Sequence, residues 1–239
     1  MAADLIVYAL VAAGLVIWLR NILGTRHGEE RERPNPFVIP PDVANTEDGA
    51  PGKTASAPED KIAALIANPD KVMAVDSKTA ENGLLDISKA DRVFDVNFFL
   101  EGAQDAFVMI VEAFAKADRD TLQNLLSEPV YKGFETAIRD RESRGETVQA
   151  EILAVRRAVI SAARYDGRMA YVTVRFQADE TTVTRDREGV VIAGHPEKSV
   201  PMRDVWTFGR DLRSRDPRWL VFETGTDPDG DNDVIPNAG

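Results

Sequence analysis

The chain has 239 residues, of which 44% are hydrophobic and 29% charged, and its formal net charge is −11. This length suits one large domain or two small ones. Because the chain has no cysteine, disulfides, thiolate metal sites and thiol catalysis are excluded, and its two histidines argue against a histidine-based triad or a multi-histidine metal site. The negative net charge argues against two functions, wrapping nucleic acid and binding anionic lipid by overall electrostatic attraction.

The first apolar run, residues 5–19, contains no charged or strongly polar side chain. As a helix it reaches roughly 22 Å, short of the roughly 30 Å hydrocarbon core, but flanking apolar residues extend it. We therefore expect a single transmembrane anchor over residues 1–23, with Trp18 and Arg20 at the membrane interface. A cleaved signal peptide fits less well because no basic residue precedes the run, and an interfacial helix would need a polar face.

The charges that flank this run predict its orientation. Asp4 is the only charged side chain before the run, whereas four arginines follow it between residues 20 and 33. The positive-inside tendency then places the N-terminus outside and the remainder of the chain in the cytoplasm.

Residues 24–78 are expected to form a flexible proline-rich linker with one possible short helix. The segment mixes Glu and Arg and has no apolar period up to about residue 58. A weakly amphipathic piece over 61–75 predicts the short helix, which Pro69 ends. The patch PNPFVIPP at 34–41 is apolar enough to dock elsewhere, but a solvated linker is the better interpretation.

The helix predicted over residues 94–118 organises the domain that follows. At about 100° per residue its apolar side chains gather on one broad side and its charged side chains on the other. Asp95 is the expected N-cap, Glu112 and Lys116 the expected exposed pair, and Gly102 the expected point of close approach by another backbone. The apolar face serves core packing or, in addition, floors a pocket for an apolar ligand or a partner's side chain.

The remaining elements follow from changes in hydrophobic period. Helices are predicted at residues 79–90, 121–127 and 128–146. Alternation with period two, interrupted by turn residues, predicts strands at 148–163, 168–186, 200–210 and 219–226. Helices followed by an antiparallel meander indicate an α+β domain over 79–226, with about four strands. Residues 227–239 are expected to form a disordered acidic tail. The alternative, a calcium-binding loop that begins at Asp227, does not fit because Asn232 stands where such a loop needs glycine.

Three motifs occur in order along this domain: the helix at 94–118, EPVYKGFETAIRDRESRGE at 128–146 and DVWTFGRDLRSRDPRWLV at 204–221. Together they resemble the Tim-forty-four-like domain family. The run WLRNILGTRHG at 18–28 is similar to the juxtamembrane signature of the bacterial TimA branch of that family.

The resemblance implies a cystatin-like or nuclear-transport-factor-two-like cone, in which helices pack on a curved antiparallel sheet. Its mitochondrial relative is a peripheral inner-membrane subunit that tethers the import motor to the translocation channel and touches anionic lipid. The bacterial branch is regarded as a membrane-anchored adaptor. This chain differs from the mitochondrial form by its expected anchor, which favours an adaptor over a chaperone tether.

Two sets of side chains are candidates for binding. The expected pocket or partner-binding residues are Phe99, Phe107, Ile110, Phe114, Trp206, Phe208 and Trp219. An arginine cluster, suited to phospholipid headgroups or an acidic partner, consists of Arg210, Arg213, Arg215 and Arg218. Pairing of these arginines with Asp204, Asp211 and Asp216 is the structural alternative, which we favour.

No catalytic residue, metal site or cofactor is expected, because the sequence has no nucleophile–base spacing and no phosphate-cradling glycine motif. We expect a single-pass protein of the bacterial inner membrane whose cytoplasmic domain is an adaptor for a protein partner, for lipid or for both, without nucleic acid. Relatedness to translocase tethering subunits suggests protein transport. The alternative is a carrier of a lipid or other hydrophobic ligand in the cone cavity.

Overall fold

The protein is described by a computed structural model that covers residues 35–37, 57–68 and 71–227. These residues all lie in one compact unit, residues 34–239. None of their helices has the length and apolar character needed to cross a membrane. The expected anchor at 1–23, with Trp18 and Arg20, and the tail after Asp227 lie outside the described residues.

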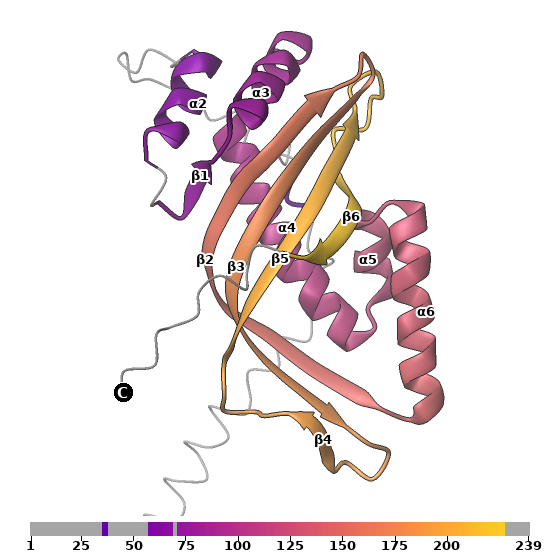
Figure 1. The fold of residues 1–239 in the computed structure, drawn as a ribbon. Coiled ribbons are helices and arrows are strands. Elements are labelled where there is room, and N and C mark those ends of the chain that lie inside the picture. Colours follow the sequence, from indigo (N-terminus) through magenta and orange to yellow (C-terminus); the bar gives the residue numbers. More distant parts are fainter. Residues whose placement is uncertain (1–34, 38–56, 69–70, 228–239) are drawn as a thin grey trace, which may run out of the picture. The chain divides into compact units, whose positions relative to one another are not determined.

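A six-stranded sheet forms the framework of this unit (Figure 1). Its order is β1-β2-β3-β5-β6, with β4 paired to β3, and only the β1–β2 pair is parallel. The strands are β1 (Met73–Val75), β2 (Thr147–Tyr165), β3 (Met169–Arg185), β4 (Val191–Gly194), β5 (Val200–Asp211) and β6 (Leu220–Thr226). All four predicted strands are present, and β1 and β4 are additional.

Strand β2 bends because its pairing with β3 is interrupted by register shifts at Ile152/Ala154, Val155/Arg157 and Ile160/Ala162. Each extra residue in an antiparallel ladder bends the strand and increases its twist. The long strands therefore curve past α4 (Val96–Lys116), which lies behind them in Figure 1.

Helix α4 has the predicted boundaries and the predicted buried face. The Asp95 carboxylate caps it by accepting hydrogen bonds from the backbone N–H groups of Asn97 (2.9 Å) and Phe98 (3.2 Å). Glu112 and Lys116 form the expected exposed pair at 3.2 Å. The α+β class predicted from the sequence is confirmed, because this helix and its neighbours pack against a sheet of several strands.

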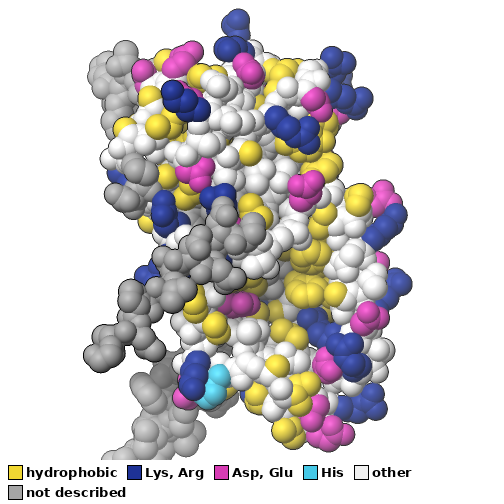
Figure 2. All heavy atoms as spheres, in the orientation of Figure 1, with side chains coloured by type: hydrophobic (Ala, Val, Ile, Leu, Met, Phe, Trp, Pro, Cys, Tyr) yellow, Lys and Arg dark blue, Asp and Glu magenta, His cyan; other side chains and the backbone are white. Residues whose placement is uncertain are grey.

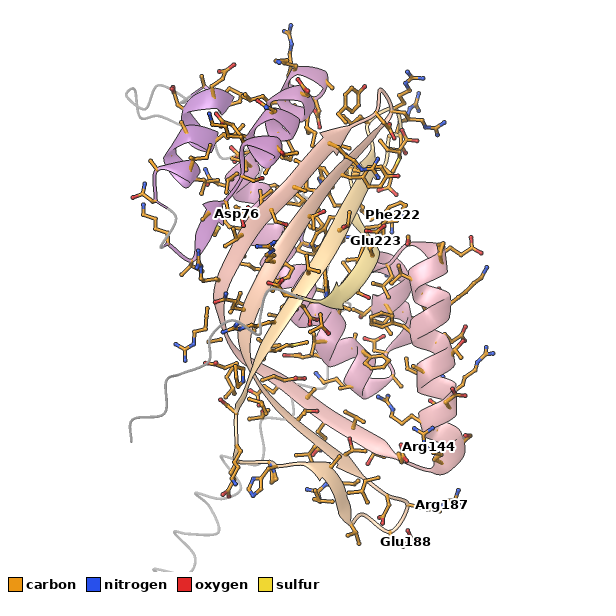
Figure 3. The ribbon with its side chains drawn as sticks, in the orientation of Figure 1. Asp76, Arg144, Arg187, Glu188, Phe222 and Glu223 are labelled. Carbon is orange, nitrogen blue, oxygen red and sulfur yellow. The ribbon has the colours of Figure 1, made fainter. Side chains whose placement is uncertain are left out.

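Two helices follow α4 along the chain. α5 (Arg119–Leu125) begins after the N-cap Asp118, and α6 (Glu128–Arg144) ends at Gly145, whose φ of 71° places it in the left-handed region that glycine favours. The C-terminal end of α6, marked by Arg144, approaches the hairpin that carries Arg187 and Glu188 (Figure 3). Gly145 leaves room there, since a Cβ atom would lie 2.6 Å from Nε of Arg187.

The packed core begins earlier in the chain than the expected boundary at residue 79. Helix α2 (Pro58–Ile66) and strand β1 are packed with the core, and α3 (Lys78–Ala90) lies against β2. The helix expected over 61–75 therefore ends before Pro69, and its last residues form β1. The predicted end of the helix before Pro69 agrees with the structure, whereas β1 was not predicted, because a three-residue parallel strand gives no period that separates it from a helix segment.

Phe37 also departs from the linker expected over residues 24–78. Its side chain is 5% exposed and packs on Phe99 and Phe208, with ring centroids 5.9 Å apart in both cases. The prediction that another backbone approaches Gly102 is wrong, because the close neighbour is the Phe37 ring, 2.8 Å from where a Cβ atom would be. A backbone does approach Gly83, where a Cβ atom would lie 1.9 Å from the carbonyl oxygen of Ala163.

Candidate functional site

The aromatic residues predicted to line a pocket divide into two groups. Phe99, Phe107, Phe208 and Trp219 are at most 4% exposed and pack on other rings of the core. The centroids of Phe99 and Trp219 are 4.8 Å apart, and those of Phe107 and Phe176 are 4.5 Å apart. These four side chains hold the sheet and α4 together and line none of the cavities described below.

The other three predicted residues line an open cavity of about 370 Å³ between the C-terminal half of α4 and the sheet. We call this the α4 cavity. Its lining residues are Ile110, Val111, Phe114 and Ala115 of α4, Phe134 of α6, Val148 and Ala150 of β2, Glu180 and Thr182 of β3, Met202, Asp204 and Trp206 of β5, and Thr224, Gly225 and Thr226 of β6. Most of this surface is apolar, as expected of a binding cavity.

Two carboxyl groups face this largely apolar space. Burial raises the pKa of Glu180, and the nearby charge of Asp204 raises it further. Burial also raises the pKa of Asp204, although the hydrogen bond from the indole Nε1 of Trp206 to its carboxylate, 3.1 Å long, opposes that rise. No Lys, Arg or His is among the described residues that line the α4 cavity.

Phe114 and Phe134 line both the α4 cavity and a neighbouring surface groove. Their rings meet edge to face with centroids 5.0 Å apart. The groove, about 540 Å³, is lined by Phe114, Pro129, Val130, Gly133, Phe134, Ala137, Glu223 and Thr224, and we call it the α6 groove. Glu223 lies on its β6 side (Figure 3). In the space-filling view, hydrophobic side chains are exposed between β5 and α6, and charged side chains border them on α6 (Figure 2).

Arg141 fixes the α6 side of this site. Its guanidinium is buried and donates hydrogen bonds from Nη2 to the carbonyl oxygens of Phe114 (2.9 Å) and Ala115 (3.1 Å). It also lies 5.3 Å from the centre of the Phe114 ring, in cation–π geometry. Because these carbonyls are at the C-terminal end of α4, Arg141 caps that helix and positions Phe114.

The predicted arginine cluster is largely engaged within the protein. Arg210 pairs with Asp91 at 3.0 Å, Arg218 pairs with Asp216 at 2.6 Å, and Nη2 of Arg213 donates to the carbonyl oxygen of Gly167. Arg215 is exposed. Of the three aspartates expected to pair with the cluster, only Asp216 does so. Asp204 accepts from Trp206, and Asp211 pairs with Arg168.

Sequence reasoning missed Glu180, Asp204 and Arg141 as site residues. Glu180 has the same parity in β3 as the buried Phe176 and Ala178, and Asp204 has the same parity in β5 as Trp206 and Phe208. An acidic residue that interrupts an apolar alternation was therefore a usable signal. Arg141 had no comparable signal, because α6 contains several arginines that differ only in what they contact.

Chemically, the site offers an apolar binding surface with negative charge and no evident catalytic machinery. Among the residues that the structure describes, no group of three or more His, Asp or Glu side chains is placed to hold a metal ion. The arrangement is suited to binding an apolar segment that carries a positive charge.

Comparison with known proteins supports the family predicted from the three motifs. The model of the Tim44-like domain matches residues 80–226, which include α4, α6 and the long strands that line the α4 cavity. The chain belongs to the Tim44-like domain family. The predicted family is thereby confirmed, and the similarity of residues 18–28 to its bacterial TimA branch stays a prediction.

The Tim44-like domain is also similar to curated proteins. The chain is 22% identical over 168 residues to a probable mitochondrial import inner membrane translocase subunit of Caenorhabditis elegans, covering 69% of this chain and 38% of that protein. It is 25% identical over 151 residues to the human mitochondrial import inner membrane translocase subunit TIM44, covering 62% of this chain and 33% of the human protein. The matched part is thus about a third of these relatives' length.

One solved structure similar to this chain is the intermembrane space region of the chloroplast protein ARC6. The TM-score is 0.34 at 18% identity, over 53% of this chain and 95% of that structure.

Proposed function

We propose that this protein is a membrane-anchored adaptor of the inner membrane, whose Tim44-like domain binds a protein partner through the α4 cavity and the α6 groove in a process related to protein transport. The observation that carries the proposal is the apolar site formed by Phe114, Phe134 and Trp206 within a domain of this family. The relatives' names, as translocase subunits of the mitochondrial inner membrane, support the proposed process and an inner-membrane location.

The anchor, the orientation and the cone-like fold belong to the same proposal. Residues 1–23 would span the membrane with the N-terminus outside, which puts the domain in the bacterial cytoplasm. The bend of β2 around α4 supports the cone expected from the family. Any contact with anionic lipid is assigned to the exposed Arg213 and Arg215, because Arg210 and Arg218 are already paired with aspartates.

A carrier of a hydrophobic ligand is the second candidate function. The α4 cavity, at about 370 Å³, is within the usual range for a small-molecule site and favours this candidate. The adjoining α6 groove favours the adaptor instead, since a ligand held inside the cavity would need no second apolar surface outside it.

Site-specific photocrosslinking of the full chain in native membranes separates these functions. A photoreactive amino acid at Ala137 would face the α6 groove, whereas the same probe at Arg139 lies about 200° away around the helix and serves as the control. We expect one discrete protein adduct from position 137 and none from position 139. A lipid or small-molecule adduct from position 137, without any protein adduct, would replace the adaptor with the carrier.

A further inference from the structure

The two carboxyl groups of the α4 cavity are unusual among the half-buried acids of this protein. Three other half-buried acids each have a cationic partner: Asp91 pairs with Arg210, Asp95 with Lys61, and Asp179 with Arg156. Among the described residues, Asp204 has only the indole N–H of Trp206 as a hydrogen-bond donor. Glu180 accepts no hydrogen bond and forms no ion pair within the described part of the chain.

An arrangement of this kind costs stability in the unliganded protein. A carboxylate withdrawn from water needs a cation or several hydrogen-bond donors to replace its hydration. Here two carboxylates share one mainly apolar cavity, and the residues that line it provide one indole donor and three threonine hydroxyls. The raised pKa values of Glu180 and Asp204 are consistent with this cost.

The ligand that best complements the α4 cavity is a positive charge at the end of an aliphatic chain. Lysine and arginine carry their charge at the end of an aliphatic chain that packs on apolar surface. The rings of Phe114, Phe134 and Trp206 line the same cavity, and aromatic faces attract such cations. A phosphate or fatty-acid carboxylate would instead be repelled by the two acids.

The cation belongs to a chain long enough to extend out of the cavity. The α6 groove shares Phe114, Phe134 and Thr224 with the α4 cavity, so the two surfaces are continuous. A small free amine would leave the groove empty, whereas a peptide segment would place apolar neighbours of the basic residue there.

We propose that the α4 cavity receives a lysine or arginine side chain of the partner protein, held between Glu180 and Asp204, with flanking apolar residues of the same segment in the α6 groove. This inference rests on the proposed adaptor function and specifies the chemistry of the partner's binding segment. It also assigns the cavity to a cation, which excludes anionic lipid as its ligand.

The test uses the full chain and three acetylated and amidated pentapeptides, Leu-Phe-X-Phe-Leu, in which X is Lys, Gln or Glu. Binding is measured by isothermal titration calorimetry at neutral pH. We expect the Lys peptide to bind about tenfold more tightly than the Gln peptide, and the Glu peptide to bind most weakly. In the double variant Glu180→Gln, Asp204→Asn, the preference for Lys should disappear while the Gln peptide still binds.

The matched control is Glu188→Gln, an exposed carboxylate of the β3–β4 hairpin, which should preserve the preference. Equal affinity for all three peptides, tighter binding of the Glu peptide, or no binding of any of them would overturn the inference.

Failure of this inference and failure of the proposed function are distinguishable. If position 137 gives a protein adduct but the three peptides bind equally well, the adaptor function stands. Only the proposal that the α4 cavity receives a lysine or arginine is then rejected. The absence of any protein adduct from position 137 would remove the adaptor itself, whatever the peptides do.

Discussion

Glu180 and Asp204 are the residues at which the proposed binding site is expected to lower the stability of the protein. Their pKa values are raised by burial, so the folded state holds these protons more tightly than the unfolded chain does. The resulting penalty is absent below the unfolded-state pKa, grows as the pH rises and is complete above the folded-state pKa. Charged groups kept in place at such a cost are typical of functional sites.

Replacing Glu180 with Gln is therefore expected to stabilise the protein at neutral pH. The gain should shrink as the pH falls toward the unfolded-state pKa of a glutamate, because the wild-type side chain then becomes neutral as well. Denaturant unfolding of the full chain across this pH range measures the difference, and Glu188→Gln is the exposed control. A loss of stability at neutral pH would mean that the Glu180 carboxylate is already stabilised by a group of this protein, which would contradict the account.

The buried Arg141 makes a different prediction. Arg141→Gln removes the guanidinium hydrogen bonds to the carbonyl oxygens of Phe114 and Ala115, and the Phe114 carbonyl keeps only its bond from the backbone N–H of Ala117. This loss should cost about 2 kcal/mol of unfolding free energy. Arg139→Gln removes only the exposed pair with Glu135 and should cost about 0–0.5 kcal/mol. Similar losses in the two variants would show that Arg141 is not the cap of α4.

At the level of elements, the helices and strands that could be predicted from the sequence are those with a clear hydrophobic period. The amphipathic α4, the cap Asp95 and the alternating strands were all readable, because each depends on residues close in sequence. Strand β1 and the docking of Phe37 depend on pairing with distant segments, and three or fewer residues carry no period. The same limit explains the site: its apolar residues were predicted, but which of them face a cavity depends on how α4 crosses the curved sheet.

Glycines in two helices test the packing of these elements. Gly83→Ala puts a methyl group against the backbone of Ala163 and should destabilise the protein by about 2–3 kcal/mol. Gly133→Ala, on α6, meets no atom within 4 Å and should stabilise the protein by about 1 kcal/mol through helix propensity. Thermal unfolding of both variants checks the contrast. Equal effects would contradict the close contact between α3 and β2.

The docking of Phe37 is also a prediction about elements. Phe37→Ala removes a buried ring from the contact with Phe99 and Phe208, and we expect a loss of about 2 kcal/mol in unfolding free energy. Phe98, which is 38% exposed, provides the comparison, and Phe98→Ala should cost clearly less. If Phe37→Ala left stability unchanged, residues 35–37 would not belong to the folded unit.

At the scale of the whole molecule, the α4 cavity and the α6 groove form one continuous apolar surface with negative charge inside it. The exposed apolar side chains between β5 and α6 (Figure 2) and the two carboxyl groups of the α4 cavity are the features that support the proposed protein partner with a basic, apolar segment. The net charge of −11 acts in the same direction, because it attracts basic partners over a distance.

The most direct measurement of this account is to identify, by mass spectrometry, the partner peptide that crosslinks to the photoreactive residue at position 137 of the full chain in its native membrane. We predict a single peptide in which a lysine or arginine stands among apolar residues, and whose yield falls in the Glu180→Gln, Asp204→Asn variant. An acidic peptide, or a lipid adduct as the main product, would contradict the account.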